Sequence, residues 1–79
     1  MTSQTTGSLV TTVARNVKAG RLASNRTQRD VAEAVGVDQM VVSKWERGRH
    51  RPSDENMVRL AALYEVPVAW LYTEHKEAA

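Results

Sequence analysis

The sequence has no cysteine, which excludes disulfide bonds and zinc sites built from thiolates. Aromatic residues make up only 5% of the 79 residues, whereas 42% are hydrophobic, so aliphatic side chains must supply most of the core. No uninterrupted apolar run approaches the roughly 18 residues that a membrane-spanning helix requires. The polar N-terminus has neither the basic nor the apolar segment of a secretory signal. We therefore expect one small, soluble, cytoplasmic domain with a thin helical core and no membrane partner.

Charge is distributed unevenly along the chain. The formal net charge is only +2, but residues 1–51 carry nine Lys/Arg against four Asp/Glu, and residues 52–79 carry two against five. The first segment therefore has a net charge of +5 and the second a net charge of −3. A basic segment of this kind indicates an anionic partner, such as nucleic acid.

Hydrophobic spacing predicts helices, and no sustained period-two pattern predicts a strand. Residues 1–8 are polar and rich in Thr and Ser, so we expect a flexible arm there. From Ser8 the apolar residues of a first helix recur with helical spacing, namely Leu9, Val10, Val13, Ala14 and Val17. The residues expected to face outward are Arg15, Asn16 and Lys18. This helix should end near Asn25, which can adopt the left-handed conformation that often follows a helix.

Capping residues and a glycine delimit two short helices in the middle of the chain. Thr27 is the expected N-cap of a second helix at about residues 28–35. Gly36 can adopt the positive φ that a sharp turn needs, and Asp38 is expected to cap a third helix at about residues 39–47. Two helices joined by a turn of about three residues are therefore predicted.

Two further helices are predicted in the acidic segment. Gly48 should end the third helix, and the basic loop that follows it stops at Pro52. Ser53 should cap a fourth helix, and Pro67 should start a short fifth one. Residues 73–79 read as a polar tail.

The second and third helices carry the residue pattern of a helix-turn-helix. Ala32 lies where the two helices cross closely, so only a small side chain fits, and Gly36 makes the turn. The residues that would hold the two helices at a fixed angle are Val31, Val35, Val37, Val42 and Trp45. We therefore expect Trp45 in the core.

The third helix should have one apolar and one polar face. At about 100° per residue, Val41, Val42 and Trp45 lie on one side of it. The other side is an arc of about 140° around the helix axis, and its side chains are Gln39, Ser43, Arg47, Met40 and Lys44. Nine residues make a rod about 13 Å long, close to the width of a B-DNA major groove. The size and the chemistry of this helix both suit insertion there.

The segment from Thr27-Gln28 to Gly48, with its closing run Trp45-Glu46-Arg47-Gly48, resembles the lambdoid phage repressor and Cro family of helix-turn-helix DNA-binding proteins. The resemblance covers most of residues 9–72 and implies an all-α, compact bundle of about five short helices. It also implies a transcriptional regulator that binds double-stranded operator DNA in the major groove through the third helix. Such a protein commonly acts as a homodimer on a two-fold operator, here in a bacterial cell.

The resemblance also implies roles for single residues. Gln28 matches a glutamine that contacts a phosphate and supports the recognition helix, and Gln39 matches a base-reading residue suited to adenine. Met40 and Lys44 match variable base-reading positions, where a thioether can pack on a thymine methyl group and an ammonium can donate to guanine. The other expected phosphate contacts are Ser43, Arg47, Arg49 and Arg51.

Several polar and apolar residues receive structural interpretations. Glu46 is expected to pair with a nearby arginine or a helix terminus rather than to read cytosine. The cations of the first helix are interpreted mainly as a solvated face, with a contact from one of them to the DNA backbone as the alternative, and these are Arg15, Lys18 and Arg21. Leu22 is expected to replace a core leucine that the family has just before its second helix. For Trp70 and Tyr72 the alternatives are closure of the core and a homodimer contact, and of these two residues Trp70 is the better candidate for such a contact.

We predict a sequence-specific DNA-binding transcriptional regulator, in particular a phage or mobile-element Cro-like or short repressor that acts by operator occlusion. An antitoxin, a restriction-modification control protein, and a protein-interaction module without DNA binding remain alternatives. Enzymatic activity is not expected, because no motif fixes a nucleophile to a base. Metal binding is not expected either, because His50 and His75 are the only imidazoles and lack ligand partners at helical spacing. No cofactor or small-molecule ligand is expected.

Overall fold

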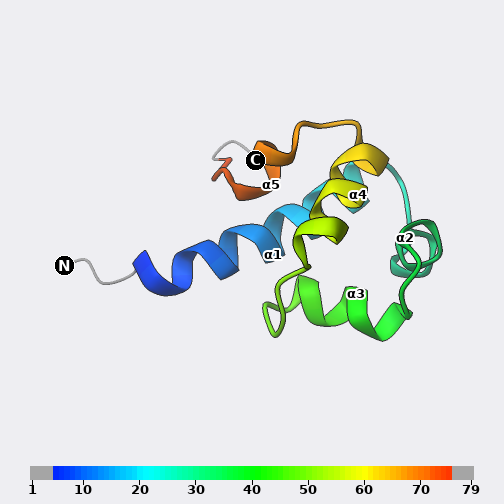
Figure 1. Ribbon diagram of the computed structural model, residues 1–79, viewed down its shortest axis with the longest axis horizontal. Coiled ribbons are helices and arrows are strands. Elements are labelled where there is room, and N and C mark those ends of the chain that lie inside the picture. The colour runs from blue at the N-terminus through cyan, green and yellow to red at the C-terminus, as the bar shows by residue number, and fades with distance from the viewer. Residues whose placement is uncertain (1–4, 76–79) are drawn as a thin grey trace.

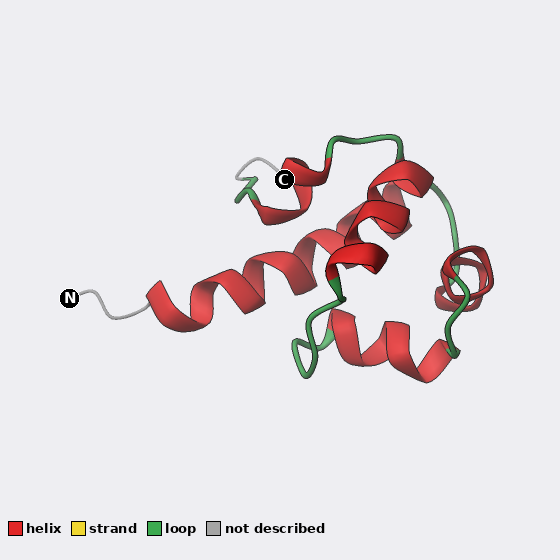
Figure 2. Cartoon of the chain, viewed as in Figure 1, coloured by secondary structure: helices red, strands yellow, loops and turns green. Residues whose placement is uncertain are grey.

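Five helices make up the computed structural model, which describes residues 5–75 (Figure 1). They are α1 (Thr5–Ala23), α2 (Gln28–Val35), α3 (Gln39–Glu46), α4 (Asp54–Tyr64) and α5 (Val68–Tyr72). Figure 2 shows only helices and loops over these residues. The predicted all-α bundle of about five helices is therefore confirmed.

The long helix α1 forms the base on which the others pack. It contacts α3, α4 and α5, while α2 packs on α3 and α4, and α4 packs on α5. The N-terminal turns of α1 project beyond the other four helices (Figure 1). Leu9 and Val10 lie on this projecting part and are exposed, so the buried stripe of α1 begins further along the helix.

The core is a single cluster that draws residues from all five helices. Its largest fully buried side chains are Met57, Leu60, Leu71, Val13, Val17, Val31 and Val42. Trp45 is only 3% exposed, which confirms that it is a core residue. Leu71 closes the core from α5.

A close approach of α4 to α1 depends on Gly20. A Cβ atom at this position would overlap the ring of Tyr64. The Tyr64 hydroxyl donates to the carbonyl of Val17 at 2.8 Å. Burial raises the pKa of Tyr64 above its ordinary value, so the hydroxyl stays protonated and keeps this hydrogen bond. The importance of Gly20 cannot be seen in the periodicity of α1.

The predicted caps of α2 and α4 are present. The Thr27 hydroxyl accepts from the backbone N–H of Asp30 at 3.0 Å, and the Asp30 carboxylate accepts from the backbone N–H of Thr27 at 3.0 Å. This reciprocal capping box lowers the pKa of Asp30. The Ser53 hydroxyl accepts from the N–H of Asn56 at 3.2 Å. Asp38 stands at the N-cap position of α3, but its side chain makes no capping hydrogen bond, so that part of the prediction was wrong.

The first helix differs from its prediction at the start. It begins at Thr5, so residues 5–8 of the expected arm are helical, while residues 1–4 lie outside the described residues. Extending an existing helix is far easier than nucleating one, because each added residue gains a hydrogen bond. The end of α1 agrees with the prediction, since Asn25 follows it with a positive φ of 59°.

Two side chains of α1 were assigned to the wrong environment. Asn16 was expected to face outward, but it is 3% exposed and its amide donates to the carbonyls of Trp70, Leu71 and Thr73 at 3.1, 3.0 and 2.8 Å. It satisfies carbonyls that the end of a short helix leaves free. Leu22 was expected in the core, but it is 57% exposed because it lies about 200° around the helix from the buried Gly20.

None of the helices described between residues 5 and 75 is both long and apolar enough to cross a membrane. Within the same residues, no three His, Cys, Asp or Glu side chains are grouped so that they could hold a metal ion.

Candidate nucleic-acid interface

A three-residue turn joins α2 to α3 and sets their relative direction. Gly36 has a φ of 79°, and the N–H groups of Gly36 and Val37 donate to the carbonyl of Ala32 at 2.9 and 3.0 Å. Val31 and Ala32 are buried in the core. The turn therefore has the predicted glycine geometry, and the small residue at position 32 is buried.

The third helix has the two faces that its sequence predicts. Val42 and Trp45 are buried, and Val41 packs against the core. Gln39 and Met40 lie on the other side, where Met40 is 62% exposed. The helix ends at Glu46, one residue before the predicted end.

Five of the predicted contact residues line one shallow hollow along α3, and these are Gln28, Gln39, Met40, Ser43 and Arg47. Gln28 belongs to the first turn of α2, so the hollow joins the start of one helix to the exposed face of the next. Lys44 is half-buried and lies outside this hollow. The fold thus brings the predicted amide, thioether, hydroxyl and guanidinium groups to a common surface.

The carboxylate of Glu46 connects three helices beneath that surface. Arg21 of α1 donates to it through Nε at 2.6 Å and through Nη2 at 3.0 Å. The amide of Gln28 donates to Glu46 Oε1 at 3.0 Å. The prediction that Glu46 pairs with an arginine is confirmed. The hydrogen bond to Glu46 raises the pKa of Arg21 further above its already high ordinary value, so this cation stays charged.

The interpretation of Arg21 as part of a solvated face was wrong. Its side chain is only 12% exposed, and that of Glu46 is 4% exposed. Arg21 also donates to the carbonyl of Arg26 at 3.1 Å, which closes the end of α1. A signal for this pair was present in the sequence, because Glu46 follows the buried Val42 by four residues and so borders the core face of α3.

Gln28 therefore has a visible supporting role. Its amide nitrogen carries two hydrogens, one of which is used by Glu46. The second remains for another acceptor. Since Glu46 is the last residue of α3, this hydrogen bond ties the first turn of α2 to the end of the third helix.

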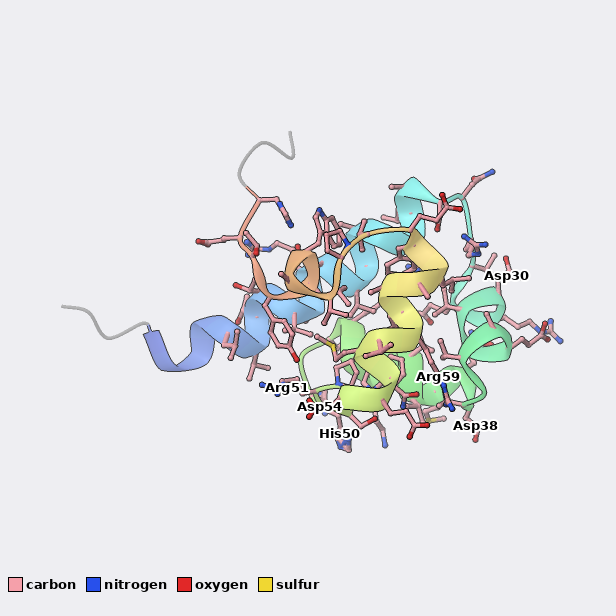
Figure 3. The ribbon with its side chains drawn as sticks, turned by 45° about the horizontal axis from the view of Figure 1, so that its top comes forward. Asp30, Asp38, His50, Arg51, Asp54 and Arg59 are labelled. Carbon is pink, nitrogen blue, oxygen red and sulfur yellow. The ribbon has the colours of Figure 1, made fainter. Side chains whose placement is uncertain are left out.

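The basic loop after α3 begins with a glycine in the left-handed conformation. Gly48 has a φ of 74°, and the N–H of Arg49 donates to the carbonyl of Lys44 at 2.9 Å. Figure 3 shows His50 and Arg51 on this loop, close to Asp54 at the start of α4. Arg49, His50 and Arg51 are all exposed. The predicted phosphate contacts of the loop are thus accessible.

Trp70 and Tyr72 have different neighbours. The guanidinium of Arg51 lies 5.8 Å from the centre of the Tyr72 ring. The ring of Trp70 stacks on that of His75 with 4.5 Å between ring centres. Both aromatic side chains are half-buried. Tyr72 therefore supports the basic loop, whereas Trp70 lines a separate surface hollow with Leu63, Val66 and the end of α1.

Comparison with known proteins agrees with this geometry. A helix-turn-helix family model (HTH_3) matches residues 17–71, which extend from the middle of α1 to α5. The HTH-type transcriptional regulator DicA of Escherichia coli (strain K12) is 28% identical over 60 residues. The match covers 76% of this chain and 44% of DicA, so the chain spans less than half the length of this curated relative.

Solved structures share the fold. The hypothetical transcription factor NHTF from Neisseria superposes with a TM-score of 0.80 at 28% identity, over 87% of this chain and 79% of that one. The clp gene regulator ClgR of Corynebacterium glutamicum has a TM-score of 0.75 at 27% identity, over 80% and 67% of the two chains. The restriction-modification controller C.AhdI of Aeromonas hydrophila, at 24% identity and a TM-score of 0.74 over 80% of this chain and 96% of that one, shows the fold alone. From the family match and the geometry of α2 and α3, this chain belongs to the helix-turn-helix family of the lambdoid repressor and Cro type.

Proposed function

We propose that this protein regulates transcription by binding specific sequences of double-stranded DNA, with α3 in the major groove. The observation that carries the proposal is the division of α3 into two faces. Val42 and Trp45 anchor the helix in the core, while Gln39 and Met40 are presented to solvent beside Gln28. Because α3 is held in this way, it can enter the major groove and keep its packing against the core.

The proposed base contacts are Gln39, Met40 and Lys44. The amide of Gln39 is suited to bidentate pairing with adenine, and Met40 can cover a thymine methyl group with its exposed side chain. Lys44 lies further around α3, outside the shallow hollow, so it would donate to a neighbouring guanine.

The proposed phosphate contacts surround these base-reading groups. Gln28, Ser43 and Arg47 line the hollow along α3, and Arg49 and Arg51 extend the surface into the loop. Phosphate contacts fix the register of the protein on the duplex but do not read its sequence. All of these groups lie within residues 1–51, whose net charge is +5.

We also propose that the protein binds DNA as a homodimer and represses by covering a two-fold operator, in the manner of a Cro-like repressor of a phage or another mobile element. The resemblance of residues 27–48 to that family supports this setting. The two half-sites would be about 10 base pairs apart, one turn of the duplex. Trp70, with Leu63 and Val66 beside it, is better suited to a dimer contact than Tyr72, whose ring already lies under Arg51.

Selection of bound duplexes from a random pool tests the proposal. We expect a palindrome with half-sites about one helical turn apart. Gln39→Ala should weaken binding to the selected sequence by about 1–3 kcal/mol and relax the preference at one base pair. A protein that binds no duplex even in low salt would contradict the proposal and support a protein-interaction module. The proposed function is DNA binding and involves no catalytic step.

A further inference from the structure

A second hollow lies between α1 and the end of α3. Its α1 wall consists of Thr11, Ala14, Arg15 and Lys18. These positions follow the spacing i, i+3, i+4 and i+7, so they share one face of the helix. Its other wall consists of Glu46, Arg47 and Gly48. Two of the cations that were interpreted as a solvated face therefore lie beside the end of the recognition helix.

The α1 hollow and the hollow along α3 share one lining residue, Arg47. A surface that carries the proposed base-reading and phosphate contacts therefore extends past Arg47 onto the side of α1. A duplex with α3 in its major groove has a sugar-phosphate backbone along each edge of that groove. Because the protein is wider than the groove, the surface of α1 beside the end of α3 would face one of these backbones.

The cations of the α1 hollow are unpaired within the described residues. Arg15 and Lys18 are exposed, and neither takes part in an ion pair there. Elsewhere on the surface Arg29 lies 3.8 Å from Glu33, and Arg59 lies 2.8 Å from Glu55. An external anion would therefore not have to displace a carboxylate from either of the two α1 cations.

The negative groups near the hollow are already neutralised. Glu46 is the one acidic residue that lines it, and its buried carboxylate accepts hydrogen bonds from Arg21 and Gln28. The last carbonyls of α3 are also occupied, since the N–H groups of Arg47 and Gly48 donate to the carbonyls of Ser43 and Trp45 at 3.0 and 3.1 Å. The field in the hollow is therefore set by cations.

Small residues keep the hollow open. Ala14 is buried against the core, and Gly48 has no side chain. A Cβ atom placed on Gly48 would lie 3.9 Å from the nearest atoms of Ala14 and Val10, which shows how closely the loop approaches α1. The long side chains of Arg15, Lys18 and Arg47 therefore surround a hollow whose floor is formed by Ala14 and Gly48. This arrangement leaves room for a phosphate group.

We propose that this α1 hollow binds neighbouring backbone phosphates of duplex DNA through Arg15, Lys18 and Arg47, so that α1 takes part in DNA binding together with α3. The inference rests on the proposed function. It adds two phosphate contacts that the helix-turn-helix segment alone does not contain. Because these groups contact phosphate and not base edges, they strengthen binding to every sequence equally.

The test uses the double variant Arg15→Gln, Lys18→Gln in the full chain, titrated with a selected operator and an unrelated duplex over a series of salt concentrations. Each lost phosphate contact lowers the slope of log K against log salt by about 0.9, which corresponds to a factor of about 8 in affinity at 0.1 M salt. We expect the double variant to lose about 60-fold on both duplexes, with the ratio between them unchanged. The variant Arg15→Lys keeps the charge and should bind almost as the unchanged protein does.

Arg59→Gln is the matched control, because it removes one cation from α4, outside both hollows. It should leave the salt slope unchanged. If it reduces the slope as much as a single α1 substitution does, the effect is one of net charge and the inference is overturned. A double variant with an unchanged slope overturns the inference alone, provided that Gln39→Ala still relaxes sequence preference. If the unchanged protein binds no duplex, the proposed function fails as well.

Discussion

Replacing the Glu46 carboxylate by an amide should destabilise the fold strongly while leaving its shape almost unchanged. In Glu46→Gln the side chain keeps its size but loses its charge. Arg21, which is 12% exposed, is then left as a buried cation without its partner. The new amide group also turns a donor toward the guanidinium or toward Gln28, because only one of its two terminal atoms can accept.

The size of this effect follows from the burial of both partners. Breaking a buried pair by removing one charge costs about 3–5 kcal/mol, whereas an exposed pair contributes about 1 kcal/mol or less. The Glu46 side chain is 4% exposed, so the larger range applies. A domain of this size has a total stability of about 4–12 kcal/mol, and its melting temperature falls by roughly 4–8 °C for each kcal/mol lost. We therefore expect a decrease of at least about 12 °C.

Urea and thermal unfolding followed by circular dichroism measure the loss. The exposed pair Arg59 and Glu55 offers a control, since Glu55→Gln should change the free energy of unfolding by less than about 1 kcal/mol. The double variant Arg21→Met, Glu46→Leu removes both charges and should recover most of the stability. A loss below about 1 kcal/mol in Glu46→Gln, or a double variant no more stable than the single one, would refute the argument that the buried cation causes the effect.

Three further outcomes follow from the packing and the caps. Gly20→Ala should lower the free energy of unfolding by about 1–3 kcal/mol in urea titrations, because its methyl group overlaps Tyr64, and an unchanged midpoint would contradict that close approach. Asn16→Leu should lower the free energy of unfolding by about 1–3 kcal/mol or more and loosen α5, seen as faster amide exchange there, because the carbonyls of Leu71 and Thr73 lose the donor that Asn16 provides. Asp30 has a lowered folded pKa, so its capping contribution is present above its unfolded pKa of about 4 and disappears as the pH falls through the lower folded value. In thermal unfolding from about pH 5 to pH 2, Asp30→Asn should therefore lose less stability than the unchanged protein, and identical profiles would contradict this.

Local features of the sequence were sufficient to predict most of the fold. Thr27 and Ser53 cap helices as predicted, and Gly36 and Gly48 take the positive φ values that end α2 and α3. The buried and exposed faces of α3 also follow from its sequence, since Trp45 is buried and Met40 exposed. Caps, turns and helical periodicity depend on residues only a few positions apart, so they can be inferred without knowledge of the distant chain.

The environment of the polar side chains on α1 could not be inferred in the same way. Helical spacing places Asn16 and Arg21 on the buried side of α1, three residues after Val13 and four after Val17, but it cannot supply their partners, which lie far away in the sequence at α5 and at Glu46. Gly20 is required because Tyr64, 44 positions later, lies against it.

The sequence by itself therefore determined the helices, their caps and the polar face of α3, because these arise from interactions within one or two helical turns. Only the tertiary structure decided which partners the polar side chains of α1 meet and which of its cations stand beside the recognition helix. Burial of a polar or charged group depends on whether another helix supplies its hydrogen-bonding partner, and that is a property of how the helices pack against one another.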